Sequence, residues 1–127
     1  MVSGDRQAVS GKPHEAWKSA MDLVEGDYRI TATFPASEQF GLVSQMRRAS
    51  VSVPSNLAEG AARDGVREFA HFLSIAKGSL SELDTQYQLA QRLGFIKESH
   101  TDLAGLIEKV SKLVTGLHKK VKEGART

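Results

Sequence analysis

Residues 65–94, GVREFAHFLSIAKGSLSELDTQYQLAQRLG, decide the fold class of the chain. Apolar and small residues recur there at alternating intervals of four and three without a break. They are Phe69, Leu73, Ala76, Leu80, Leu83, Tyr87 and Ala90. This spacing is typical of an α-helix that packs against neighbouring helices at a shallow angle. Gly94 follows Leu93 and is predicted to be the C′ residue that ends this helix.

Two helices are predicted before this segment and one after it. Pro13 suits a first helical turn, and a stripe at spacings of three and four follows it: Trp17, Ala20, Met21, Val24 and Tyr28. The last helix has a longer stripe: Leu103, Leu106, Ile107, Val110, Leu113, Val114, Leu117 and Val121. Because short links join the four helices, the sequence predicts an all-α fold, an antiparallel up-down-up-down four-helix bundle over residues 13–122.

The stretch RRASVSVPSNLAEG, residues 47–60, also resembles a strand, because its β-branched residues roughly alternate. Pro54 argues against a central strand, since proline has no N–H to donate to a sheet. A helix fits better, because one helical face keeps its phase through the proline. That face consists of Gln39, Val43, Met46, Ser50, Val53 and Leu57. We therefore predict one long helix over residues 37–63, kinked or loosened at Pro54.

The composition is that of an ordinary globular domain. The chain has 127 residues, no cysteine and a formal net charge of +2. No apolar run reaches the roughly 18 residues of a membrane span, so we expect no membrane partner. The lack of cysteine suits a reducing compartment, and we expect a cytoplasmic location. Residues 1–12 lack the apolar region of a secretory signal and are predicted to be a disordered tail. Residues 123–127 are predicted to be a basic C-terminal tail.

Two sets of residues are candidates for contacts with a partner. The first is basic and could contact the phosphates of RNA or DNA: Arg47, Arg48, Arg63, Arg67, Lys119, Lys120 and Lys122. The lysines equally suit a solvated helix end, where cations oppose the helix dipole. The second set is apolar or small, lies outside the predicted core stripes, and could form an interface between copies: Val51, Pro54, Ala58, Phe72, Ile75 and Leu89. The face around Pro54 could instead be solvated, with a Glu59–Arg63 pair on it.

Four segments of the chain carry a resemblance to a known family. They are AWKSAMDLV (16–24), GLVSQMRRASVSVPSNLAEG (41–60), REFAHFLSIAKGSLSELDTQ (67–86) and LAQRLGFI (89–96). The most specific part comprises Arg47, Arg48, Pro54, Ser55, Asn56, Ala58, Glu59 and Gly60. Over roughly residues 15–122, the chain resembles the 23S rRNA intervening-sequence family.

The resemblance implies an antiparallel four-helix bundle that assembles as a ring-like homopentamer. Some members of that family are encoded inside ribosomal RNA genes, and the similar variability proteins that accompany retroelement reverse transcriptases bind nucleic acid. Relatives often carry a glycine and paired basic residues after the position of Gly60, followed by serine. Here that stretch is AARDG, with Asp64 in the basic patch. We therefore expect any binding of nucleic acid to be weak.

One spacing in the sequence could carry metal chemistry. Glu68 and His71 form a Glu-x-x-His, which di-iron four-helix bundles use in pairs together with two further glutamates. The sequence has no second motif of this kind. Phe69 marks the core direction of its helix, which places Glu68 and His71 on other faces. We therefore expect no metal, no cofactor and no enzymatic activity.

The sequence favours a non-enzymatic, homo-oligomeric scaffold or adaptor that binds a protein or nucleoprotein partner. The alternative is a low-specificity RNA- or DNA-binding protein that contacts phosphates through its arginines and lysines.

Overall fold

The computed structural model describes residues 13–97 and 102–125. These residues form four α-helices and one short 3₁₀ helix, and none of them is in a strand. The α-helices are α2 (Pro13–Thr31), α3 (Leu42–Ala62), α4 (Val66–Arg92) and α5 (Asp102–Ala125), and the 3₁₀ helix is η1 (Ala36–Glu38). The predicted all-α fold is confirmed. The predicted tail over residues 1–12 lies outside the described residues.

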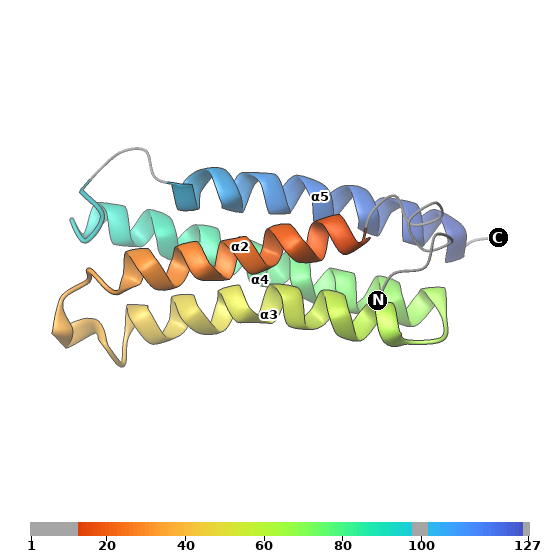
Figure 1. The fold of residues 1–127 in the computed structure, drawn as a ribbon, viewed down its shortest axis with the longest axis horizontal. Helices are drawn as coiled ribbons and strands as arrows, with labels where there is room; N and C mark the ends of the chain where they lie inside the picture. Colours follow the sequence, from red (N-terminus) through yellow and green to blue (C-terminus); the bar gives the residue numbers. More distant parts are fainter. Residues whose placement is uncertain (1–12, 98–101, 126–127) are drawn as a thin grey trace.

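The four helices lie side by side and enclose one core. Figure 1 shows consecutive helices running in opposite directions along the long axis. Contacts join α2 to α3, α3 to α4, α4 to α5, and α5 back to α2. Each helix therefore has two neighbours within the bundle.

Helix α4 follows the predicted pattern closely. Every residue of its predicted seam from Leu73 to Ala90 is buried, and Phe69 packs against the core. Gly94 has a φ of +80°. Its N–H donates to the Gln91 carbonyl at 3.1 Å, and the Phe95 N–H donates to the Ala90 carbonyl at 2.9 Å. This pair of hydrogen bonds is the Schellman motif, so Gly94 ends the helix as predicted.

Helix α3 runs through Pro54 as predicted but begins five residues later than expected, at Leu42 rather than residue 37. The 3₁₀ turn of η1 occupies the predicted first turn, and Glu38 Oε1 accepts a hydrogen bond from the Leu42 N–H at 3.1 Å. A carboxylate at this position satisfies a free helix N–H and suits the positive end of the dipole. Gln39 therefore lies outside the helix, while the rest of the predicted stripe is buried.

The predicted stripe of α2 is only partly in the core: Ala20 is buried and Trp17 packs against the core, but two of its residues lie outside. Met21 and Tyr28 are 41% and 43% exposed. The buried face is formed instead by Pro13, Ala16, Ser19, Ala20, Leu23, Gly26, Asp27 and Thr31. Apolar spacing does not select the polar residues of this face, and it does select Met21 and Tyr28, which are exposed. Helix α2 therefore has an apolar face beyond the one that packs in the core.

The C-terminal boundary also differs from the prediction. Helix α5 continues through Ala125, so residues 123–125 extend the helix and are not a separate tail. Residues 126 and 127 lie outside the described part of the chain. The helix continues because no proline or turn sequence interrupts its regular apolar stripe, of which Val121 is the last buried member.

Helices α3 and α4 approach each other closely at Gly60. A Cβ atom at this position would lie 2.8 Å from Phe72 Cβ and 3.0 Å from Phe69 Cδ1. Phe72 is half-buried and packs on this bare backbone. Only glycine leaves room for both aromatic side chains, so Gly60 sets the separation of the two helices at this end of the bundle.

We predict that Gly60→Ala lowers the free energy of unfolding by about 1–2 kcal/mol. Overpacking destabilises by about 1–3 kcal/mol. The higher helix propensity of alanine offsets about 0.5–1 kcal/mol of this. The matched control is Gly78→Ala, because Gly78 also lies within a helix but has no neighbour within 4 Å of a Cβ atom. Urea unfolding followed by circular dichroism measures both variants. Equal stabilisation by the two substitutions would contradict the packing role of Gly60.

Candidate interaction surfaces

A buried carboxyl group joins α2 to α3. Asp27 is fully buried, and Ser50 Oγ donates a hydrogen bond to its Oδ2 at 2.9 Å. Its Oδ1 has no hydrogen-bond partner among the described residues. Burial raises the pKa of Asp27 to about 6. The hydrogen bond from Ser50 and the charge of Arg47 act in the opposite direction but are smaller effects. The contact between α2 and α3 therefore contains a group that titrates not far below neutral pH.

Arg47 belongs to the same helix pair. Its Nε donates to Thr31 Oγ1 at 2.9 Å, and its Nη2 donates to the Tyr28 carbonyl at 3.3 Å. Its guanidinium carbon lies 4.3 Å from the centre of the Tyr28 ring. These contacts place a positive charge at the C-terminal end of α2, where the helix dipole favours a cation. Arg47 therefore holds α3 against α2, whereas the neighbouring Arg48 is exposed and forms no ion pair within the described residues.

A hollow of about 710 Å³ lies over the outer face of α3. Three apolar or aromatic side chains at its border are exposed: Tyr28 by 43%, Val51 by 40% and Phe40 by 94%. Arg47 and Arg48 also line it, and no carboxylate is among its lining residues. This surface, called the α3 hollow below, combines exposed apolar groups with positive charge.

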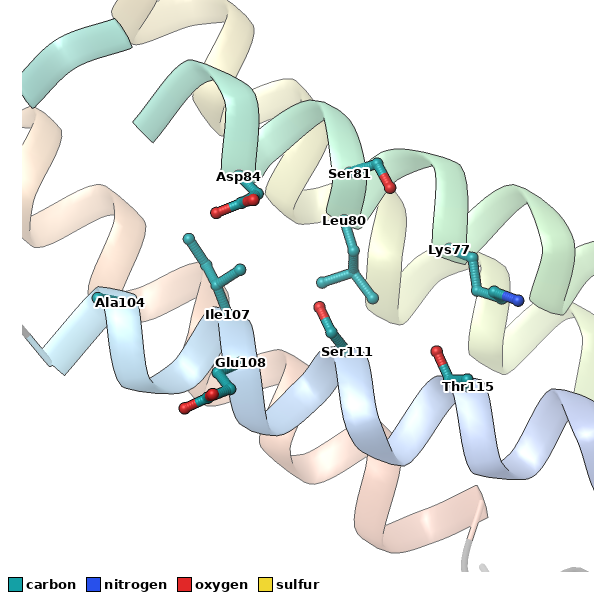
Figure 2. A pocket seen from close by; sticks show the side chains of 9 residues that line it. All are labelled: Lys77, Leu80, Ser81, Asp84, Ala104, Ile107, Glu108, Ser111 and Thr115. Carbon is teal, nitrogen blue, oxygen red and sulfur yellow. The ribbon is translucent and has the colours of Figure 1, made fainter. Parts of the chain in front are cut away.

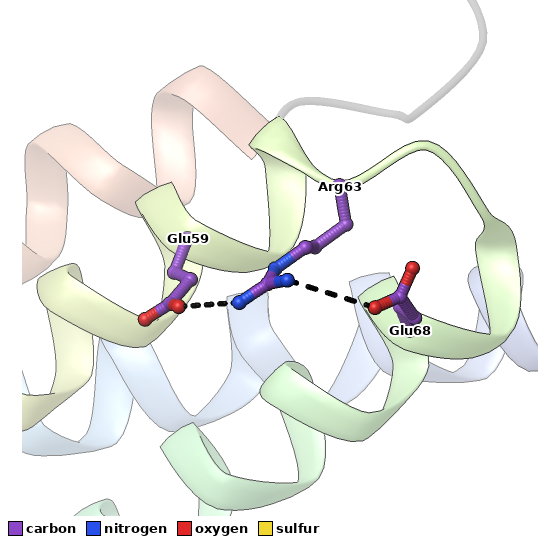
Figure 3. Close-up of polar contacts among 3 residues, drawn as sticks. All are labelled: Glu59, Arg63 and Glu68. Atoms are coloured by element: carbon purple, nitrogen blue, oxygen red, sulfur yellow. Dashed lines mark hydrogen bonds and ion pairs between the residues drawn. The ribbon is translucent and has the colours of Figure 1, made fainter.

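The turn between α3 and α4 contains a second arginine with partners in the chain. Figure 3 shows Arg63 between two carboxylates, with 2.7 Å from Nη2 to Glu59 Oε2 and 3.8 Å from Nη1 to Glu68 Oε2. Its guanidinium carbon lies 5.0 Å from the centre of the Phe72 ring. The predicted Glu59–Arg63 pair is confirmed. Because two carboxylates face Arg63, its charge is largely balanced within the chain.

A groove of about 380 Å³ runs between α4 and α5 on the outside of the bundle. Figure 2 shows its lining: Lys77, Leu80, Ser81 and Asp84 from α4, and Ala104, Ile107, Glu108, Ser111 and Thr115 from α5. Asp84 Oδ2 accepts a hydrogen bond from Gln88 Nε2 at 3.1 Å, and Glu108 Oε2 lies 3.9 Å from Lys112 Nζ. This surface, called the α4–α5 groove below, was not predicted from the sequence. Its small polar residues come from two helices whose relative alignment only the fold defines.

The predicted basic residues fall into two groups at different ends of the bundle. Figure 1 shows the α3–α4 connection and the C-terminal end of α5 at the same end. Arg63, Arg67 and the predicted lysines of α5 therefore lie toward that end. Arg67, Lys119, Lys120 and Lys122 are all exposed. Arg47 and Arg48 lie toward the other end, because Arg47 contacts the last turn of α2.

The predicted interface residues differ in exposure. Val51, Ala58, Ile75 and Leu89 are exposed, and Phe72 is half-buried. Pro54 is buried within the single chain, so its side chain offers no surface to a partner. The prediction that Pro54 is an interface residue is therefore wrong. The proline ring faces the side of α3 that packs into the bundle, and only its neighbours Val51 and Ala58 extend the surface.

The possible metal ligands of the sequence lie on the surface. Glu68 and His71 are exposed, and Glu68 pairs with Arg63. Among residues 13–97 and 102–125, no group of three or more His, Cys, Asp or Glu side chains is arranged to hold a metal ion. None of the helices in the same ranges combines the length and apolar composition that a bilayer span requires.

The described residues thus define a small all-α protein built as a four-helix bundle. The family described as 23S rRNA-intervening sequence protein matches residues 12–116, and the chain belongs to this family. The resemblance noted from the sequence is therefore confirmed. A comparison with proteins that have curated descriptions gives no match.

We predict that Asp27→Asn removes a pH dependence of stability. Between about pH 4 and 6, the folded chain holds a proton on Asp27 that the unfolded chain has released, so the free energy of unfolding falls as pH rises. A pKa raised from 3.8 to about 6 corresponds to a fall of up to about 3 kcal/mol. The variant should gain stability relative to the wild type across this window.

Urea unfolding at several pH values between 4 and about 7 tests this, because the window follows from the two pKa values of Asp27. Asp22→Asn is the matched control, since Asp22 is an exposed carboxylate of the same helix. If the Asp27→Asn curve stays parallel to that of the wild type, the buried carboxyl group does not titrate in this range.

Proposed function

We propose that the protein is a non-enzymatic, homo-oligomeric scaffold or adaptor, which assembles as a ring and binds a protein or nucleoprotein partner in the cytoplasm. The observation that carries this proposal is the exposed apolar surface beside α3. Phe40 is 94% exposed, and Tyr28 and Val51 lie beside the same hollow. Apolar side chains that gather on one surface of a small domain are typical of protein interfaces. A homopentamer, as the family resemblance implies, would cover such a surface.

The environment of the arginines also supports an assembly over a nucleic-acid binder. Arg47 is held by Thr31 and Tyr28, and Arg63 is held between two carboxylates. Binding phosphate would require each of them to give up contacts that stabilise the bundle. Asp64 adds an exposed negative charge beside Arg63. Half of the predicted arginine set is therefore already used by the fold.

We predict that the wild-type protein is an oligomer at micromolar concentration and that Val51→Lys weakens its assembly. A lysine at this position would lose its water when the interface forms, and it would replace the apolar contact that Val51 makes there. Val66→Lys is the matched control, because Val66 is an exposed valine of α4 outside the α3 hollow. Sedimentation equilibrium measures both. A monomeric wild type would overturn the proposed assembly.

One observation favours the alternative, a direct RNA- or DNA-binding protein. Lys119, Lys120 and Lys122 are exposed near the end of α5, on the same end of the bundle as Arg67. The pKa of His118 is lowered by burial and by the charges of Lys77 and Lys122, which is consistent with a positive field there. Repetition around a ring would strengthen weak contacts, because linked sites raise the effective concentration.

We predict weak binding to a mixed-sequence RNA and to a DNA duplex, with an affinity that falls steeply with salt. Fluorescence anisotropy at about 50 and about 200 mM salt measures it, since phosphate contacts lose orders of magnitude in affinity over this range. Replacing Lys119 and Lys120 with alanine should flatten the salt dependence. Replacing Lys109 and Lys112, two other exposed lysines of α5, is the control. No binding at the lower salt would eliminate this alternative.

A further inference from the structure

The α3 hollow and the α4–α5 groove carry opposite charge. Two arginines and no carboxylate line the hollow. Two carboxylates and one lysine line the groove, and Figure 2 shows Lys77 displaced along the groove from Asp84 and Glu108. Glu108 is partly balanced by Lys112, whereas the hydrogen-bond partner of Asp84 is the neutral Gln88. Arg48 in the hollow and Asp84 in the groove are thus charges without an ion pair inside the described chain.

The two surfaces also lie at the same height along the bundle. Ser52 of α3 and Ser79 of α4 share a hydrogen bond of 2.7 Å, which fixes the alignment of these helices. Because α3 and α4 run in opposite directions, Arg48, one turn before Ser52, is level with the residues one turn after Ser79. Asp84 lies at that level, and Glu108 lines the groove beside it.

The two surfaces lie over different helices and do not share lining residues. A contact between them would join unlike surfaces of two copies, which is a heterologous contact. If the copies are related by rotation about an axis parallel to the helices, each residue keeps the same height along that axis in every copy. Arg48 of one copy would then meet Asp84 of the next, while the exposed Phe40 and Val51 would be covered.

We propose that the α3 hollow of one copy packs on the α4–α5 groove of the next, with Arg48 facing Asp84 across the interface. This inference rests on the proposed homo-oligomer and names the surfaces that build it. Repetition of a heterologous contact closes a ring when the rotation per copy divides a full turn. The occupant of both surfaces is therefore a second copy of this chain.

Reversal of the two charges tests the pairing. Arg48→Glu and Asp84→Arg should each raise the dissociation constant of the oligomer by at least about tenfold, since each places like charges opposite one another. The double variant Arg48→Glu/Asp84→Arg should return to within about threefold of the wild type, because the attraction is restored. Lys109→Glu, on an exposed residue of α5 outside both linings, is the control. Sedimentation equilibrium measures all four variants.

Cysteine cross-linking tests whether the contact is heterologous, and the wild-type chain has no cysteine to interfere. Val51→Cys in the hollow and Ser111→Cys in the groove should not form disulfides when each variant is oxidised alone. A mixture of the two should give a covalent dimer, and a chain with both substitutions should give a ladder of larger species. Asp22→Cys mixed with Ser111→Cys is the control, because Asp22 lies outside both linings.

The outcomes separate this inference from the proposed function. A monomeric wild type overturns both. An oligomeric wild type whose assembly is unchanged by either charge reversal, or whose Val51→Cys and Ser111→Cys mixture stays uncrosslinked, overturns the paired surfaces and leaves the oligomer standing. Self-linking of Val51→Cys alone would show that the hollow meets another hollow, which also overturns the proposed contact.

Discussion

The burial of Asp27 is the constraint on which the arrangement of α2 and α3 depends. A carboxyl group without solvent is costly unless it is protonated or well bonded, and only Ser50 donates a hydrogen bond to it among the described residues. Arg47 lowers the cost through its charge and also ties α3 to the end of α2. The two helices can therefore pack in this alignment only if Ser50 and Arg47 face Asp27, which fixes their rotation and their relative height.

The opposite side of α3 is fixed by different chemistry. Ser52 bonds to Ser79 of α4, and Asn56 Nδ2 donates to the Ser52 carbonyl at 2.8 Å and to Ser52 Oγ at 2.9 Å. One turn further on, Gly60 gives Phe72 a bare backbone on which to pack. Helix α3 thus bonds to α2 through Ser50 and to α4 through Ser52. Part of the sequence signature that resembles the family therefore has a structural explanation: Arg47 and Gly60 contact neighbouring helices, and Asn56 orients Ser52.

Sequence periodicity could predict the helices in which apolar residues keep an unbroken spacing along the buried face. The stripe of α4 was predicted correctly although Ser79 and Gln86 are also buried, and the buried residues of α5 are all aliphatic. The stripe of α2 was misplaced because Asp27 and Thr31 lie in the core, while Met21 and Tyr28 lie outside. No rule of hydrophobic spacing identifies a buried aspartate, since its hydrogen-bond donor comes from another helix. The α4–α5 groove was missed for the same reason, because it exists only where two helices meet.

The misplaced stripe of α2 is itself informative about function. A helix that needed only one packed face would not expose Met21 and Tyr28 while burying an aspartate. Tyr28 lines the α3 hollow together with the exposed Val51 and Phe40. In a monomer this surface stays in contact with water, which is unfavourable roughly in proportion to its apolar area. The fold stabilises a polar contact inside the bundle and leaves apolar side chains outside it, and this distribution supports the proposed homo-oligomer.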